Sequence, residues 1–397
     1  MEMALPLLKR SSVTLRGQSS ITTEELPLIV KMGKLRLREQ TMWSDLPEHL
    51  MERILECLPV DCFFCYKAVC QTWNALFSSQ HFNSIARNSQ PFLILCPSST
   101  QLPSLLYSFF THTWRTISLS FIPHECHCPI NFRGSASGLL LADINANFCF
   151  GYSSPTLCVC NPLSQMYSLL PEMGSVSRIM AKAILPVGDK RNEYTVMVVG
   201  MNSTGRVVVE AYNSTTMAWK VAGTIPDVDI RNENMFFCKG SLFCVTASGG
   251  IMAYNVEQGI TTIVSMPTVD AHNLWARLVC CKIGLVVVGA IEENHSLKGL
   301  IMWELVFHEM VKDYKWVEIG KMPNSVCEEF RRSSNSNWFD CVGVGDKICF
   351  RANESMLILV YDVSTASWNW LAKFCEDLRF VSMGWLPLQP MPNLKFC

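Results

Sequence analysis

The sequence predicts a multidomain chain of α and β structure, in which a small three-helix module precedes an all-β propeller of about six blades. Residues 43–59, WSDLPEHLMERILECLP, have helical spacing, and two more short helical segments follow them. Beyond residue 90, short apolar runs alternate with Gly, Pro, Asn and Ser, which is typical of strands and turns. A motif that recurs about every 50 residues in this second part indicates a propeller.

Composition and charge exclude several classes of protein. The 397 residues are 49% hydrophobic and 17% charged, so the chain can bury one or two cores and is not mostly disordered. Its net charge of -1 lacks the basic field expected of a nucleic-acid-binding protein. No apolar run reaches the ~18 residues that a membrane-spanning helix needs. We therefore expect neither nucleic acid nor a membrane as a direct partner.

The N-terminal segment and the cysteines indicate a reducing compartment. Residues 1–41 are predicted to be a poorly ordered leader. They lack the pattern of a secretory signal, and Glu2, Glu24 and Glu25 disfavour a transit peptide. The 19 cysteines form an odd, scattered set, which is typical of reduced thiols that fill a core. We expect the protein in the nucleus and/or the cytoplasm.

The first helix is predicted to begin near Asp45 and to end before Pro59. Asp45 and Glu48 form a capping-box pattern, and Pro47 falls in the first turn, where its missing N–H costs nothing. The apolar side chains spread over about 180°, whereas a surface helix needs about 100°. Each buried Leu or Ile contributes about 1.5–3 kcal/mol, so another protein or the rest of the chain should cover the surplus.

Residues 42–88 contain, in this order, Leu46-Pro47, Ile54-Leu55, Leu58-Pro59, Val69-Cys70 and Trp73. This order and spacing resemble the F-box, a three-helix module. Departures are mild: Phe63 or Phe64 stands where Leu is frequent, and Gln71 where a basic residue is frequent. The resemblance implies that the apolar face docks on the Skp-family adaptor of a cullin-based ubiquitin ligase. The implied adaptor-binding residues are Leu46, Pro47, Leu50, Ile54, Leu55, Leu58, Pro59, Val69 and Trp73. From the residues alone, a helical subdomain packed on its own C-terminal part remains the alternative.

Six repeats predict the propeller over residues 89–397. In five of them a polar residue lies six positions before a closing residue that is mostly aromatic, as Asn213 does before Trp219. In the remaining repeat an insert separates Glu304 from Trp316. We expect four short antiparallel strands in each repeat, with the closing aromatic side chain filling the gap between adjacent blades. The polar residues are Ser108, Asn161, Asn213, Asn255, Glu304 and Asp362.

This spacing resembles kelch or F-box-associated repeats, and the whole chain resembles the plant F-box/kelch-repeat proteins. Kelch units carry a Gly-Gly pair, which only Gly249-Gly250 offers here. The resemblance implies a substrate-recognition subunit that reaches a cullin through the adaptor and binds an unknown protein target for ubiquitination. Alternatives are a scaffold or transcriptional co-regulator that acts without degradation, and a propeller enzyme with titratable groups lining its channel.

Motifs for catalysis, cofactors and metals are mostly absent. The sequence has no Walker loop, no Gly-x-Ser-x-Gly elbow and no His-Glu-x-x-His helix. Residues 124–128, HECHC, alternate metal-capable side chains but lack the second ligand pair of a zinc site. Cys62 and Cys65 fall among phenylalanines and are predicted to be apolar filler. We therefore expect a non-catalytic chain without cofactor or metal.

Two irregular stretches are candidates for the surface that binds the target. Residues 307–315, FHEMVKDYK, form the insert, and residues 327–341, CEEFRRSSNSNWFDC, place charged groups beside aromatic ones, which suits protein recognition. A solvated loop between blades, with internal ion pairs, is the alternative. The candidate residues are His308, Lys312, Glu328, Glu329, Phe330, Arg331, Arg332 and Trp338.

Overall fold

The computed structural model divides into two units, Met1–Cys57 and Leu58–Cys397. The described helices are α2 (Glu48–Glu56) in the first unit, and α4 (Gln71–Phe77) and α6 (Asn324–Arg332) in the second. The predicted leader and the predicted boundaries at 41/42 and 88/89 lie outside the described residues. The structure describes residues 46–56, 58, 66–67, 69–77, 79, 81–82, 91–98, 102–123, 129–144, 156–185, 193–226, 228, 230, 235–267, 275–293, 296–308, 313–333, 338–352, 355, 357–371 and 383–389.

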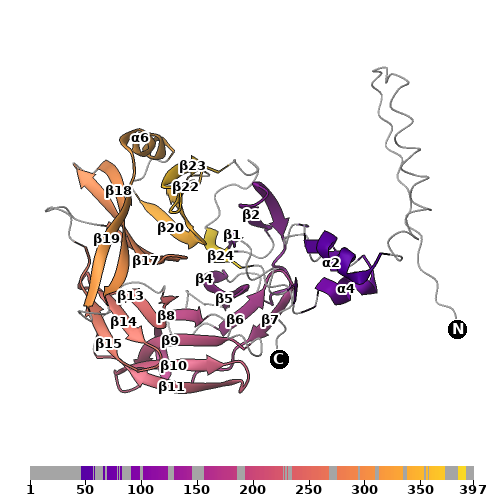
Figure 1. The fold of residues 1–397 in the computed structure, drawn as a ribbon. Helices are drawn as coiled ribbons and strands as arrows, with labels where there is room; N and C mark the ends of the chain where they lie inside the picture. The colour runs from indigo at the N-terminus through magenta and orange to yellow at the C-terminus, as the bar shows by residue number, and fades with distance from the viewer. Residues whose placement is uncertain are drawn as a thin grey trace. The chain divides into compact units, whose positions relative to one another are not determined.

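Six four-stranded antiparallel sheets form the β part of the second unit, counted over the described residues (Figure 1). The first three blades, each from its innermost strand outward, are β24 (Met383–Leu388), β1 (Phe92–Pro97), β2 (Ser104–Ser108), β3 (Thr113–Ile117); β4 (Asn131–Ala136), β5 (Leu139–Ile144), β6 (Thr156–Asn161), β7 (Met166–Leu169); and β8 (Val176–Leu185), β9 (Thr195–Asn202), β10 (Val207–Asn213), β11 (Ala218–Thr224).

The other three blades follow in the same order along the chain. They are β12 (Phe236–Cys238), β13 (Ser241–Val245), β14 (Ile251–Asn255), β15 (Thr261–Val264); β16 (Trp275–Cys281), β17 (Gly284–Glu293), β18 (Ser296–His308), β19 (Asp313–Lys321); and β20 (Phe339–Val344), β21 (Lys347–Ala352), β22 (Leu359–Asp362), β23 (Ser367–Trp370). Apolar side chains from facing sheets interdigitate between neighbouring blades, as those of blades 5 and 6 do around Phe350.

The blades close into a ring through their innermost strands. These strands contact one another in the cyclic order β24, β4, β8, β12, β16, β20 and back to β24. The C-terminal strand β24 pairs with β1 from Phe92↔Leu388 to Pro97↔Met383, so the two ends of the propeller share one blade. Such closure leaves few free sheet edges and confirms the predicted six-bladed propeller. Within the part of the chain described here, no helix has the length and hydropathy required to span a bilayer.

The repeated polar residue organises the turn between the third and fourth strands of most blades. In blade 2, Asn161 Oδ1 accepts hydrogen bonds from the backbone N–H groups of Leu163 (3.0 Å) and Ser164 (3.2 Å). The short loop then places the closing residue opposite the residue before the polar one, as in Tyr212↔Trp219. Asn213, Asn255 and Asp362 make the same pair of bonds.

The left-handed backbone after each such turn explains the six-residue spacing. Four positions after the polar residue, φ is positive in five blades, which lets a short loop reverse the chain direction. The residues concerned are His112 (φ 54), Gln165 (φ 54), Met217 (φ 51), Gly259 (φ 67) and Ala366 (φ 52). Blade 5 differs, because Glu304 lies within β18 and pairs with Val317 rather than beginning a turn.

Closing aromatic residues bridge neighbouring blades, as predicted. Trp219 Nε1 on β11 donates to the carbonyl oxygen of Pro171 at the end of the preceding blade (2.8 Å), and Trp316 Nε1 on β19 donates to that of Ser265 (2.7 Å). Tyrosines of the third strands add a second bridge. Tyr361 Oη donates to the carbonyl oxygen of Ile319 (2.8 Å). An added Cβ on the adjacent Gly320 would lie 2.5 Å from that hydroxyl, so the bridge requires glycine there.

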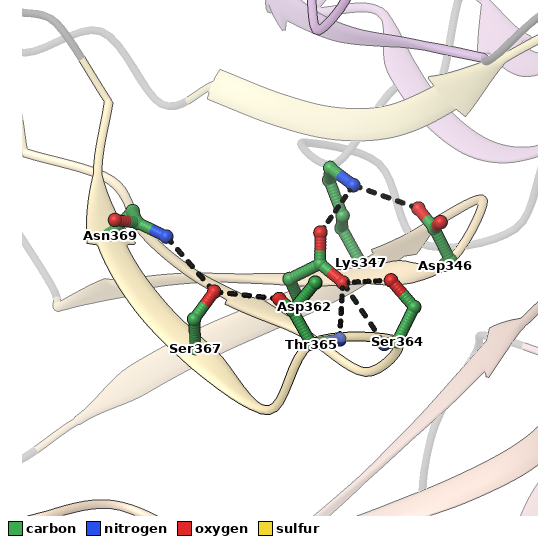
Figure 2. Close-up of polar contacts among 7 residues, drawn as sticks. All are labelled: Asp346, Lys347, Asp362, Ser364, Thr365, Ser367 and Asn369. Carbon is green, nitrogen blue, oxygen red and sulfur yellow. Dashed lines mark hydrogen bonds and ion pairs between the residues drawn. The ribbon is translucent and has the colours of Figure 1, made fainter.

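A half-buried charged network closes the turn of blade 6 (Figure 2). Lys347 Nζ lies 2.7 Å from Asp362 Oδ2 and 2.9 Å from Asp346 Oδ1. Burial opposes ionisation of Asp362, but hydrogen bonds from Lys347 and Ser364 outweigh it and lower the pKa of Asp362 to about 2. The Lys347 ammonium also lies 5.9 Å from the centre of the Phe109 ring, next to β2 of blade 1. The network therefore connects the last blade to the first.

We expect Asp362→Asn to lower the free energy of unfolding by about 1–3 kcal/mol at neutral pH, because it removes a charge-assisted hydrogen bond. Since the pKa of Asp362 is lowered from 3.8 to about 2 in the folded chain, the carboxylate stabilises the fold above pH 3.8. This contribution disappears as the pH falls through about 2. Urea unfolding of wild type and variant at several pH values should show the difference shrinking toward pH 2. Asp346→Asn is the control, and an equal loss there would contradict the special role of Asp362.

Candidate functional site

The helix α2 presents two neighbouring apolar faces. It begins after Pro47, whose carbonyl oxygen accepts hydrogen bonds from the N–H groups of Leu50 (2.9 Å) and Met51 (3.1 Å). Met51 and Leu55 are 8% and 0% exposed, whereas Leu50 and Ile54 are 41% and 42% exposed. Each pair is spaced by four residues and therefore shares a face. The wide apolar arc is thus split into a covered half and an open half.

The other predicted adaptor-binding residues differ in exposure. Pro47 is exposed, and Leu46 and Leu58 are half-buried. Leu55 is fully buried within the chain, so it cannot contact a partner directly in this conformation. Pro59 lies outside the described residues, as does the capping residue Asp45.

Residues around α4 combine an exposed aliphatic side chain with an aromatic cluster. Val69 is exposed, and Trp73 on α4 is half-buried. The Trp73 ring centre lies 6.2 Å from that of Tyr66 and 6.3 Å from that of Phe77, which in turn lies 4.9 Å from Phe82. Since Phe77 and Phe82 are buried, this aromatic cluster is a small core. Trp73 contributes to that core as well as to the surface.

The insert of blade 5 extends a hairpin. Strand pairing continues to His308↔Asp313, beyond Leu305↔Trp316, so residues 307–308 and 313–315 of the predicted irregular stretch belong to two paired strands. Residues 309–312 lie outside the described residues. β18 and β19 are therefore longer than the third and fourth strands of the other blades. Lys312 and the side chain of His308 lie outside the described residues, so their predicted role stays a prediction.

The stretch from Cys327 onward contains the helix α6, which the sequence interpretation missed. Pro323 precedes a run in which Val326, Cys327 and Phe330 follow helical spacing, and this signal could have revealed it. The prediction that Phe330 faces a target is wrong: Phe330 is 1% exposed and its ring centre lies 6.3 Å from that of Trp370. The helix is amphipathic, and its apolar side packs on blade 5.

The outer side of α6 carries charges of both signs. Its exposed residues are Glu328, Glu329, Arg331 and Arg332, and Trp338 further along the chain is 52% exposed. Arg332 and Glu328 approach to 3.5 Å as an exposed i,i+4 pair, which contributes little to stability. The charged residues predicted from this stretch therefore share one exposed surface, while Phe330 anchors the helix from below.

The centre of the propeller holds a cavity of about 260 Å³. Its described lining has two charged residues, Arg133 and Asp340. Asp340 Oδ2 accepts a hydrogen bond from Trp385 Nε1 (2.7 Å), and Arg133 Nε donates to Asp143 Oδ2 (2.9 Å). The Asp340 carboxylate thus connects β20 to β24, and the Arg133 guanidinium connects β4 to β5. Over the described residues no cluster of three His, Cys, Asp or Glu side chains could hold a metal ion, and residues 124–128 lie outside that part of the chain.

Comparison with known protein families now assigns both regions. Residues 43–85 match the F-box domain, and residues 106–367, well over half of the chain, match the KIB1-4 beta-propeller. The chain belongs to the plant F-box/propeller family. Its propeller is thus of the KIB1-4 type, and the kelch designation predicted from the spacing is not confirmed by this match.

Curated relatives of this F-box/propeller protein align with more than four fifths of its length. F-box only protein 6 of Arabidopsis thaliana is 25% identical over 351 residues, which cover 83% of this chain and 70% of that protein. An F-box/kelch-repeat protein of the same plant, At5g43190, is 26% identical and covers 86% of this chain and 84% of its own length. SKP1-interacting partner 15 of A. thaliana is 22% identical and covers 82% of this chain and 91% of its own.

Proposed function

We propose that this protein is the substrate-recognition subunit of a Skp–cullin–F-box ubiquitin ligase. Its F-box binds a Skp-family adaptor, and through it a cullin, while its propeller binds a protein target for ubiquitination. The observation that carries the proposal is the open apolar face of α2, Leu50 and Ile54, within a segment that matches the F-box. The similarity to a relative named as a SKP1-interacting partner supports it.

In this role the chain itself performs no catalysis. The ligase holds a lysine of the target near the activated ubiquitin, which makes the transfer effectively unimolecular. A receptor needs only a stable link between two binding surfaces, and the closed ring provides a rigid frame for the second one. We place this activity in the nucleus and/or the cytoplasm.

The target-binding surface that we propose is the outer side of α6 together with Trp338. Protein–protein interfaces favour aromatic and arginine side chains. Here Trp338 is exposed, and it follows the exposed residues Arg331 and Arg332 in the sequence. Packing of Cys327 and Phe330 on blade 5 holds the helix in place, so these charged groups are presented from a fixed backbone.

The decisive experiment is co-purification of the full chain with a plant Skp-family adaptor. We expect a one-to-one complex that recruits a cullin, and a captured target whose lifetime lengthens when cullin neddylation is blocked. Absence of any adaptor complex would overturn the proposal. A captured partner whose lifetime does not depend on the cullin would instead support a scaffold that acts without degradation.

Reversing the charge of the two arginines of α6 should weaken capture of the target. We expect the Arg331→Glu/Arg332→Glu variant to bind the adaptor as the wild type does. The amount of captured target should fall at least about tenfold, because two positive charges become negative at a charged interface. Quantitative mass spectrometry of captured proteins measures this. Arg206→Glu/Lys220→Glu, which changes two other exposed cations, is the matched control. An unchanged set of captured proteins in both variants would exclude α6 as the binding surface.

A further inference from the structure

Two cysteines from adjacent blades, Cys238 and Cys280, approach each other at the ends of the innermost strands of blades 4 and 5. Cys238 ends β12, and Cys280 and Cys281 end β16, the innermost strand of the next blade. The thiols of Cys238 and Cys280 lie close enough for each to influence the ionisation of the other. Cys280 Sγ also lies 3.6 Å from the carbonyl oxygen of Phe237, which can accept its proton. Cys280 therefore points toward the end of β12, where Cys238 follows Phe237.

The surroundings make the two contacting thiols unequal. The hydrogen bond from Cys280 lowers the pKa of Cys238 against the effect of burial, and the charge of Lys239 lowers it further. The same contact and burial raise the pKa of Cys280. Burial raises the pKa of an ordinary core thiol such as Cys244 to about 12. Of the cysteines whose pKa shift is resolved in the described residues, Cys238 is the one that is shifted toward the thiolate.

This pair also differs from the core cysteines in access. Cys280 lines the central cavity of about 260 Å³ and is half-buried, and Cys238 is 8% exposed. Cys158, Cys160 and Cys244 are 0% exposed. A small solute that enters the central cavity can therefore reach Cys280. Cys238 does not line the cavity but retains a small exposed fraction, whereas the fully buried thiols are shielded.

We propose that Cys238 and Cys280 form a reversible disulfide between blades 4 and 5 when the protein meets a hydroperoxide. The Cys238 thiolate attacks one peroxide oxygen, so that an S–O bond forms, the O–O bond breaks and the departing alkoxide or hydroxide takes up a proton. Cys280 then attacks the sulfenic sulfur, the S–S bond forms, and the hydroxide leaves as water with the Cys280 proton. Overall two thiols are oxidised, and one hydroperoxide is reduced to an alcohol, or to water, with one further water released.

Such a bond would covalently link two blades that otherwise meet through side-chain packing. Since the link closes the chain between Cys238 and Cys280, which includes β13, β14 and β15, into a loop, it restricts the unfolded chain and raises the melting temperature. A reducing compartment would return the pair to thiols, so that the link reports transient oxidation. The proposal does not depend on adaptor binding, because it concerns the propeller alone.

The test is peptide mapping of the full-length wild-type chain under non-reducing conditions after treatment with one equivalent of hydrogen peroxide. We expect a linked peptide pair containing Cys238 and Cys280, a loss of two hydrogen atoms from the intact mass, and a melting temperature higher by roughly 5 °C. Dithiothreitol should reverse all three changes. Thiols of both residues that survive intact, or a link between other cysteines, would overturn the proposal.

Two variants separate the roles of the three thiols. Cys281→Ser should still form the link, because Cys281 is the neighbour that the proposal does not use. Cys280→Ser should instead leave Cys238 as a sulfenic or sulfinic acid, detected as added oxygen on its peptide. Loss of the wild-type link in Cys281→Ser would show that Cys281 is the resolving thiol and would contradict the assignment of Cys280.

Discussion

A chain carrying Leu50→Glu and Ile54→Glu is expected to bind a Skp-family adaptor at least about 100-fold more weakly than the wild type. Burial of each aliphatic side chain contributes about 1.5–3 kcal/mol, and about 1.4 kcal/mol corresponds to a tenfold change in the dissociation constant. Two carboxylates on the same face add a cost of desolvation. Both residues are more than 40% exposed in the chain alone. Thermal unfolding should therefore change little, and titration calorimetry with the purified adaptor measures the loss.

The matched control makes the same chemical change elsewhere. Ile260 and Ile263, at the outer edge of blade 4, are 56% and 53% exposed, and their replacement by Glu should leave adaptor affinity unchanged. Wild-type affinity in the Leu50→Glu/Ile54→Glu chain would show that the adaptor uses another surface. Equal losses in both variants would indicate a general effect of added charge.

The helical period predicted α2 but not which half of its apolar arc is covered. Spacing fixes the angle of each side chain around the helix axis, so Leu50, Met51, Ile54 and Leu55 could be placed on one wide arc. Whether Met51 and Leu55 turn inward depends on what packs against them, and no local pattern carries that information. The open pair could therefore be named only once the structure showed the exposure of each side chain.

The propeller was predictable because its turns repeat the same local chemistry. An Asn or Asp side chain that caps the turn fixes the loop length, and this length fixes the distance to the closing aromatic residue. In blade 5 Glu304 occupies the repeated position but caps no turn, since strand pairing continues past it to His308. The spacing between Glu304 and Trp316 does not reveal whether an insert forms a loop or lengthens two strands, because pairing between the strands decides where each one ends.

The largest loss of stability expected from adding one methyl group is at Gly343, on the innermost strand of blade 6. A Cβ there would overlap the backbone carbonyl group of Cys280 on the innermost strand of blade 5. Backbone atoms cannot move aside as a flexible side chain can, so the two strands would have to separate. Overpacking of this kind costs about 1–3 kcal/mol, and we expect Gly343→Ala to reach or exceed the upper end of that range. Thermal or urea unfolding of the full chain measures it.

Gly299→Ala tests whether the loss at Gly343 comes from the contact between blades rather than from the residue type. Gly299 also lies within a strand, but a Cβ there would meet only Ile291 Cδ1 at 3.9 Å, an ordinary contact. Alanine also restricts the unfolded chain more than glycine does, so Gly299→Ala should be neutral or slightly stabilising. If Gly343→Ala proved as stable as Gly299→Ala, blades 5 and 6 would not approach as closely as the ring requires. The same close approach positions the carbonyl group of Cys280, so Gly343→Ala should also reduce formation of the Cys238–Cys280 link.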